Sequence, residues 1–422
     1  MNQYSLTTLK NGLRLITVPM PQVESVTVMV GVGAGGRHET KSVNGLFHFI
    51  EHMAFKGTKK RPSSLKIASE VYSVGGIFNA STGQERTYYF IKLASKHQEL
   101  AFDILADMLF NSLLKTEEIE KEKRVIIEEI NMYEDTPIDR IGYIFLRLIY
   151  GDNPMGWEIL GEKKTIKQIK REDFLAFIDK FYFPGNMAVA VAGRLDESRI
   201  KKLAAQYFGN FERKRKKQTK TIKLHQKKAR VKVAYKKTDQ AHFCLGVPGY
   251  WYTHPDRFTI GVLATILGGS MSSRLFWQIR ERRGLAYYVR TEADFFTDSG
   301  LLATQAGVKL EKIEEAIKIC LKEYGKIAAS KVKSQELTRA KEILKGGLIL
   351  SLEDSMNVAG RYLNHVLLEE GVRTPQRTMA LIDKVMAEDI QRVAKTIFKP
   401  EKLNLAIIGP YKDENRFKKL LR

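Results

Sequence analysis

The segment that most constrains this chain is an apolar run that carries three groups able to bind a metal or move a proton. His48, Glu51 and His52 form an H-x-x-E-H array inside Gly45-Leu-Phe-His-Phe-Ile-Glu-His-Met-Ala-Phe. This pattern predicts a buried helix, and on a helix positions i and i+4 lie one above the other. His48 and His52 can therefore direct imidazole nitrogens at one metal ion, with Glu51 on the adjoining edge.

The alternative is a structural role, in which two core histidines and a glutamate are satisfied by hydrogen bonds alone. Short motifs also arise by chance. Three polar groups on an apolar helix are costly to bury without a shared partner, which favours the metal site. H-x-x-E-H is the inverted zincin signature, in which two histidines bind zinc and the glutamate is the general base.

A catalytic zinc site presents three protein ligands, so a third is expected on a helix that faces the first. The segment from Glu117 to Asn131 is strongly helical, and its Glu122 and Glu129 are seven residues apart on one face. Alternating Glu and Lys usually mark a solvated surface, so this segment alone leaves both interpretations open.

The combined spacing resembles that of a known family. The array followed by Glu129, 77 residues after His52, is similar to the pitrilysin/insulinase family of zinc peptidases, in its mitochondrial processing peptidase branch. The resemblance implies that His48, His52 and Glu129 hold one Zn²⁺ per chain. It also implies that Glu122 supports the site and that Glu51 is the general base.

The second half contains a further match to this family. Arg280 and Tyr287 lie seven residues apart and resemble its C-terminal Arg/Tyr element, whose side chains reach substrate. By themselves they would be interpreted as an exposed helix charge and a half-buried core aromatic.

The run Ile77-Phe-Asn-Ala-Ser-Thr predicts a strand, and the resemblance implies that this strand lies beside the zinc. An extended peptide can add to an exposed sheet edge through main-chain hydrogen bonds, so Asn79 and Ala80 are candidate substrate-binding residues. An ordinary edge strand is the alternative.

Two halves with a similar order of predicted strands and helices flank a basic run at 213–237. This run contains thirteen Lys or Arg and no acid. We therefore predict a zinc-binding domain at 1–212, a junction at 213–237 and a C-terminal domain at 238–422. The halves look like diverged copies, with the metal motif only in the first. The family fold implies an α+β class, with a mostly antiparallel sheet in each half, helices on one face, and two chains meeting as a clamshell.

A net charge of +22 raises the alternative of a nucleic-acid or anionic-surface binder. The sequence contains no helix-turn-helix signature, no RNP-like strand and no Cys/His finger spacing, which favours a solvated basic junction. A non-catalytic family member acting as a partner subunit is another alternative, against which the intact site residues argue.

The apolar runs and the cysteines of the sequence indicate a cellular location. No stretch approaches about 18 apolar residues, and we find no signal peptide. Cys244 and Cys320 are far apart and fit reduced thiols. We predict a bacterial-type cytoplasmic enzyme, with a mitochondrial matrix location as the alternative. The resemblance implies a zinc-dependent endopeptidase acting on peptides in an enclosed chamber, as a homodimer whose active sites are shared between protomers.

Overall fold

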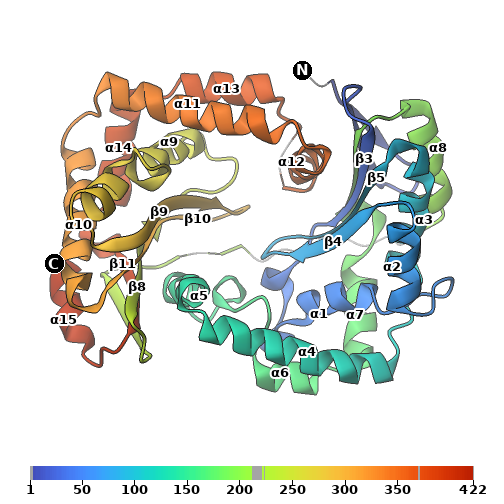
Figure 1. Ribbon diagram of the computed structural model, residues 1–422, viewed down its shortest axis with the longest axis horizontal. Coiled ribbons are helices and arrows are strands. Elements are labelled where there is room, and N and C mark those ends of the chain that lie inside the picture. The colour runs from blue at the N-terminus through green and yellow to red at the C-terminus, as the bar shows by residue number, and fades with distance from the viewer. Residues whose placement is uncertain (1–2, 212–220, 223, 369–370, 422) are drawn as a thin grey trace. The chain divides into compact units, whose positions relative to one another are not determined.

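The computed structural model describes residues 3–211, 221–222, 224–368 and 371–421 (Figure 1). The chain forms two compact units, each built on one β-sheet with packed helices. The first unit contains three segments of the chain, Met1–Asn131, Trp157–Lys220 and Leu350–Arg373. The second contains Met132–Gly156, Thr221–Ile349 and Thr374–Arg422.

The sheet of the first unit has six strands in the order β1-β2-β6-β3-β5-β4. β2 and β6 are parallel, and every other neighbouring pair is antiparallel. β4 is therefore an edge strand with β5 as its paired neighbour. The strands are β1 (Ser5–Thr8), β2 (Arg14–Pro19), β3 (Ser25–Val32), β4 (Ile77–Thr82), β5 (Thr87–Ala94) and β6 (Met187–Gly193).

The sheet of the second unit repeats this topology with five strands in the order β7-β11-β8-β10-β9. Its one parallel pair, β7 with β11, occupies the position of β2 with β6. The predicted fold class is confirmed, because both halves build the same mainly antiparallel sheet. The strands are β7 (Arg230–Tyr235), β8 (Gln240–Pro248), β9 (Ala286–Phe295), β10 (Gly300–Lys309) and β11 (Asn404–Gly409).

The helices also follow one order in the two halves. Those packed in the first unit are α1 (Leu46–Ala54), α2 (Ser64–Tyr72), α3 (Gln98–Phe110), most of α4 (Thr116–Asp135), α6 (Lys163–Gln168), α7 (Arg171–Phe181) and α8 (Glu197–Phe208). Those in the second are α9 (Arg257–Gly268), α10 (Ile313–Ala329), most of α11 (Ser334–Ser351), α13 (Pro375–Asp383), α14 (Ala387–Ile397) and α15 (Glu414–Lys418).

Two helices are exchanged between the halves of the chain. α12 (Ser355–Leu368) belongs to the first unit, where Ser355 shares a 2.9 Å hydrogen bond with Thr27 of β3. α5 (Pro137–Tyr150) belongs to the second unit, where Phe145 packs in one cluster with Cys244 of β8. Each sheet thus carries a helix that comes from the other half of the sequence. Figure 1 shows α12 on the face of its sheet opposite α3 and α8.

The predicted domain boundaries follow chain order, whereas the compact units do not, because of this exchange. Within the predicted basic junction, residues 213–220 and 223 lie outside the described residues, and β7 occupies 230–235. In the part of the chain that the structure describes, no helix is both long and apolar enough to cross a bilayer.

Candidate metal centre

The helix α1 that carries the H-x-x-E-H array begins at an unusual cap. Gly45 adopts a φ of 96°, in the left-handed region that favours glycine. The buried carboxylate of Glu39 accepts hydrogen bonds from the backbone N–H groups of Gly45 and Phe47, both at 2.8 Å. Burial raises the pKa of Glu39 to about 7, and the hydrogen bonds from Phe47 and Gly45 oppose the rise. The N-terminus of a helix favours the ionised form of such a carboxyl group. α1 is thereby held by a residue outside the helix itself.

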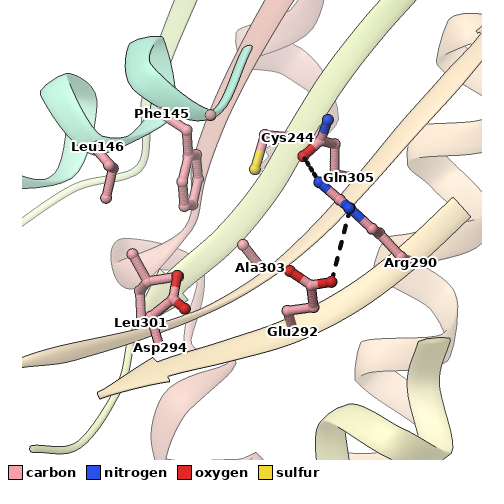
Figure 2. Close-up of a pocket in the computed structure, with 10 residues that line it drawn as sticks. Phe145, Leu146, Cys244, Arg290, Glu292, Asp294, Leu301, Ala303 and Gln305 are labelled. Carbon is pink, nitrogen blue, oxygen red and sulfur yellow. Dashed lines mark hydrogen bonds and ion pairs between the residues drawn. The ribbon is translucent and has the colours of Figure 1, made fainter. Parts of the chain in front are cut away.

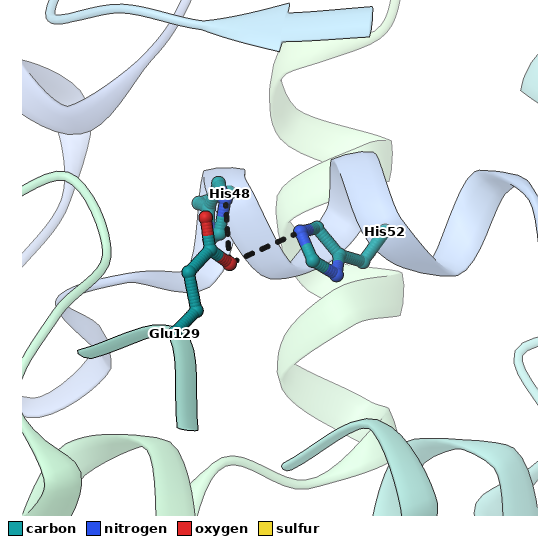
Figure 3. Close-up of side chains that lie close together, drawn as sticks. All are labelled: His48, His52 and Glu129. Atoms are coloured by element: carbon teal, nitrogen blue, oxygen red, sulfur yellow. Dashed lines mark ion pairs between the residues drawn. The ribbon is translucent and has the colours of Figure 1, made fainter. Parts of the chain in front are cut away.

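His48, His52 and Glu129 converge from two helices, as Figure 3 shows. α1 supplies both histidines one turn apart, and α4 supplies Glu129. The Glu129 Oε2 atom lies 3.7 Å from His48 Nε2 and 3.6 Å from His52 Nε2. Among the described residues, no other group of three His, Cys, Asp or Glu side chains meets in this way. The structure thus brings together the three residues predicted as ligands.

These separations fit a shared metal ion better than direct hydrogen bonds, which are shorter. Ligand atoms about 2.0–2.1 Å from one tetrahedral zinc are roughly 3.4 Å apart. One atom from each of the three residues lies within 4.8 Å of the others, so the donor set can close on one ion. Two imidazoles and one carboxylate are a donor set typical of catalytic zinc.

Glu122 supports the site from α4, one heptad before Glu129. Its Oε1 accepts a 2.8 Å hydrogen bond from His52 Nδ1, and Lys56 Nζ donates to its Oε2 at 2.5 Å. Burial by itself would raise the pKa of Glu122, but these two hydrogen bonds outweigh it, and the pKa is lowered. An ionised Glu122 holds the proton of His52 on Nδ1 and leaves the Nε2 lone pair for a metal.

Glu51 projects from α1 to the side of the histidine pair. Its Oε2 accepts a 2.5 Å hydrogen bond from the hydroxyl of Thr82, at the end of β4. Burial raises the pKa of Glu51, and the Thr82 hydrogen bond opposes the rise. A carboxylate with a raised pKa is better matched to accepting a proton near neutral pH.

The electrostatics of the two remaining ligands also suit metal binding. Burial lowers the pKa of His48 to about 3, and the proximity of His52 contributes. His48 is therefore neutral near pH 7, the form that coordinates metals. Burial raises the pKa of Glu129, which a bound cation would counteract by favouring its charged form.

Asn79 and Ala80 lie in β4, the edge strand that also carries Thr82. The Ala80 N–H donates to the side-chain oxygen of Asn79 at 2.8 Å. The contact between Thr82 and Glu51 joins this strand to α1. The end of the strand that carries Asn79 and Ala80 therefore contacts Glu51 within the first unit.

Arg280 and Tyr287 lie in the second unit, Arg280 in a π-helical turn at Phe276–Glu281 and Tyr287 in β9. The Arg280 guanidinium carbon is 5.8 Å from the centroid of the Tyr287 ring, so the two side chains adjoin. Tyr287 is 76% exposed, which does not fit a half-buried core aromatic. π-helical turns are rare in proteins, and those that occur are often found at functional sites.

Lys56 contacts Glu122 and Thr82 contacts Glu51, and neither contact was predicted from the sequence. Lys56 lies two residues beyond the end of α1, so helical spacing from His52 does not identify it. Thr82 carries no local signal either, because its contact with Glu51 depends on how β4 packs against α1.

Comparison with protein families follows the division of the sequence into halves. Residues 14–162 match the family described as Insulinase (Peptidase family M16). Residues 168–344 match the one described as Peptidase M16 inactive domain. The first match contains His48, His52 and Glu129, and the second contains Arg280 and Tyr287.

Relatives of similar length are found in several bacteria. An uncharacterized zinc protease of Bacillus subtilis is 35% identical over 409 residues, which cover 96% of this chain and 97% of the relative. One from Rickettsia felis is 36% identical over 408 residues, covering 96% and 98%. A protease from Helicobacter pylori of known crystal structure shares the fold, with a TM-score of 0.91 at 24% identity, covering 97% of this chain and 100% of that one.

The family predicted from the motif and its spacing is thus confirmed over nearly the whole length of the chain. This chain belongs to the insulinase family, peptidase family M16.

Proposed function

We propose that this protein is a zinc-dependent endopeptidase that hydrolyses peptides and small unfolded polypeptides. The convergence of His48, His52 and Glu129, with Glu51 on the same helix as both histidines, carries the proposal. Its relatives in Bacillus subtilis and Rickettsia felis are named as zinc proteases, which supports the choice of metal.

The residues divide the chemistry of hydrolysis between them. Zinc held by the three ligands would supply a Lewis acid that activates water and polarises a carbonyl. Glu51 takes one proton from the attacking water as the water oxygen bonds to the carbonyl carbon. Glu51 then delivers that proton to the amide nitrogen as the C–N bond breaks, so the products are a carboxylic acid and an amine. Thr82 orients the Glu51 carboxylate throughout.

Substrate binding is assigned to two further elements. An extended peptide would add to the edge of β4 near Asn79 and Ala80, where main-chain hydrogen bonds require little sequence preference. Arg280 would hold a substrate carbonyl or carboxylate, and the exposed hydroxyl of Tyr287 would donate to the developing oxyanion. Their mutual contact and the exposure of Tyr287 support this assignment.

The assembly belongs to the same proposal. Two identical chains would enclose a chamber in which Arg280 and Tyr287 of one protomer complete the zinc site of the other.

The proposal also includes a cytosolic location, because Cys244 and Cys320 are both buried, free thiols.

The test compares wild type with Glu51→Gln, which keeps the shape of the side chain but cannot accept the proton. We expect cleavage of a quenched fluorescent peptide library to fall at least about 100-fold, the usual contribution of a general base. Zinc content, measured in parallel, should stay near one ion per chain. Glu117→Gln makes the same chemical change at an exposed position of α4 and should leave both quantities unchanged.

Two outcomes would contradict the proposal. Hydrolysis by Glu51→Gln at a rate comparable to wild type would remove the general-base role. A wild-type protein that binds zinc and cuts no peptide would point instead to a partner subunit without catalysis of its own.

A further inference from the structure

Two hollows of the second unit differ in what they can hold. The smaller, of about 120 Å³, lies between α5 and the sheet, and its Arg290 is already engaged by Gln305 and Glu292 (Figure 2). The larger, of about 850 Å³, lies between the segment 271–278, the end of α10 and the start of α11. We call it the α10–α11 groove. Its volume leaves room for several side chains of a binding partner.

Four charged side chains in the α10–α11 groove neutralise one another. Arg274 donates from Nε and Nη2 to the two carboxylate oxygens of Glu336, both at 2.7 Å. Lys326 Nζ lies 2.7 Å from a carboxylate oxygen of the buried Glu323, and Arg274 Nη1 lies 3.9 Å from the other. Two-pronged contacts between Arg and a carboxylate fix geometry. This network therefore ties the three segments together and adds no net charge.

Two further cations of the groove are not used by the fold. The side chains of Lys333 and Arg339 are exposed, and neither forms an ion pair within the part of the chain that the structure describes. Lys331, close by in the chain, is paired with Glu388 at 2.6 Å. The groove therefore has a surplus of positive charge at Lys333 and Arg339.

The segment 271–278 adds exposed apolar surface to the groove. Met271 is 69% exposed and Trp277 is 54% exposed. Aromatic residues, Met and Arg are enriched at protein interfaces, and Trp and Arg are prominent among the residues that contribute most to binding. Each of these residue types lines the groove. This composition is typical of an interaction surface.

We infer that the α10–α11 groove docks an acidic peptide segment of a partner protein, one that carries apolar side chains beside its carboxylates. The carboxylates pair with Lys333 and Arg339, and an apolar side chain packs on Trp277 and Met271. The inference is independent of the proposed peptidase activity, because it uses none of the residues assigned to zinc, to proton transfer or to the substrate.

A nucleic acid fits the groove less well than an acidic peptide does. Glu323 and Glu336 place two carboxylates in the groove, and their charge opposes a chain of phosphates. A peptide carries fewer charges and brings the apolar side chains that match Trp277 and Met271. Charge and apolar surface together therefore favour the peptide.

The test measures binding to full-length protein that carries Glu51→Gln, so that cleavage does not compete with binding. Trp157 and Trp251 are replaced by Phe, which leaves Trp277 as the one indole of the chain. A peptide of glutamate, leucine and serine is compared with one in which glutamine replaces every glutamate. We expect the acidic peptide to shift Trp277 emission to shorter wavelength. It should bind at least about fivefold more tightly than the glutamine peptide, a factor that two exposed ion pairs supply.

Paired variants test the role of charge. Lys333→Gln combined with Arg339→Gln removes the two unpaired cations. Lys395→Gln combined with Arg377→Gln removes the same charge at exposed positions outside the groove. The first pair should abolish the preference for the acidic peptide, and the control pair should keep it.

A second pair of variants tests the apolar contact. Met271→Ser should weaken binding of the acidic peptide at least about fourfold, the factor that corresponds to one buried methylene group. Met386→Ser makes the same change at an exposed position outside the groove and should leave the affinity unchanged.

Several results would overturn the inference. These are equal affinity for the two peptides, an unchanged Trp277 emission, and a preference for the acidic peptide that survives in the Lys333→Gln, Arg339→Gln variant. Tighter binding of a single-stranded oligonucleotide would assign the groove to nucleic acid instead. A shift of Trp277 emission with protein concentration alone would assign it to a second copy of the chain. Peptide cleavage by the wild-type protein is measured separately, so the proposed function stands or fails by itself.

Discussion

Glu122 controls which nitrogen of His52 is free for a metal. Its carboxylate accepts one hydrogen bond from His52 Nδ1 and another from Lys56 Nζ. Glu122→Gln keeps the shape of the side chain but loses the charge, so we expect zinc affinity to fall at least about tenfold. Competition with a chromophoric chelator measures this affinity. Glu117→Gln, on the solvent side of the same helix, is the control. Unchanged affinity in Glu122→Gln would mean that the carboxylate does not tune the ligand.

α12 is the element that most depends on distant parts of the chain. Its fully buried Leu363 packs against Gly31 of β3, where an added Cβ atom would approach Leu363 to 2.8 Å. Leu363→Ala should destabilise the first unit by about 2–5 kcal/mol, whereas the exposed Leu350→Ala should cost less than about 0.5 kcal/mol. Urea unfolding followed by Trp157 fluorescence, with Trp251 and Trp277 replaced by Phe, reports this unit alone. Equal effects of the two changes would show that α12 contributes little to it.

At the scale of the whole molecule, a shared active site predicts complementation between two inactive chains. Glu51→Gln and Tyr287→Phe each disable one half of the proposed site. If the halves come from different protomers, dissociating and re-forming a 1:1 mixture should restore about a quarter of wild-type activity, through mixed dimers with one intact site. Glu51→Gln mixed with His48→Ala should remain inactive, because both changes lie in the same half. Peptide cleavage is the measurement, and an inactive first mixture would place both halves in one chain.

Much of the metal centre could be predicted because its determinants are local. The i, i+4 repeat on an apolar helix pairs His48 with His52, and a seven-residue interval puts Glu122 and Glu129 on one face of α4. The resemblance to the family then indicated that the two histidines and Glu129 belong to one site. The duplicated fold was also predictable, since strands and helices recur in the same order in both halves.

The tertiary structure alone decided which surfaces meet. An amphipathic pattern shows that a helix face is buried but not against which sheet, so the exchange of α5 and α12 could not be derived from the sequence. The contact of Thr82 with Glu51 has the same origin, because it joins residues far apart in the chain. Helix periodicity together with the family resemblance therefore determined the candidate ligands and the fold class, and long-range packing decided what surrounds them.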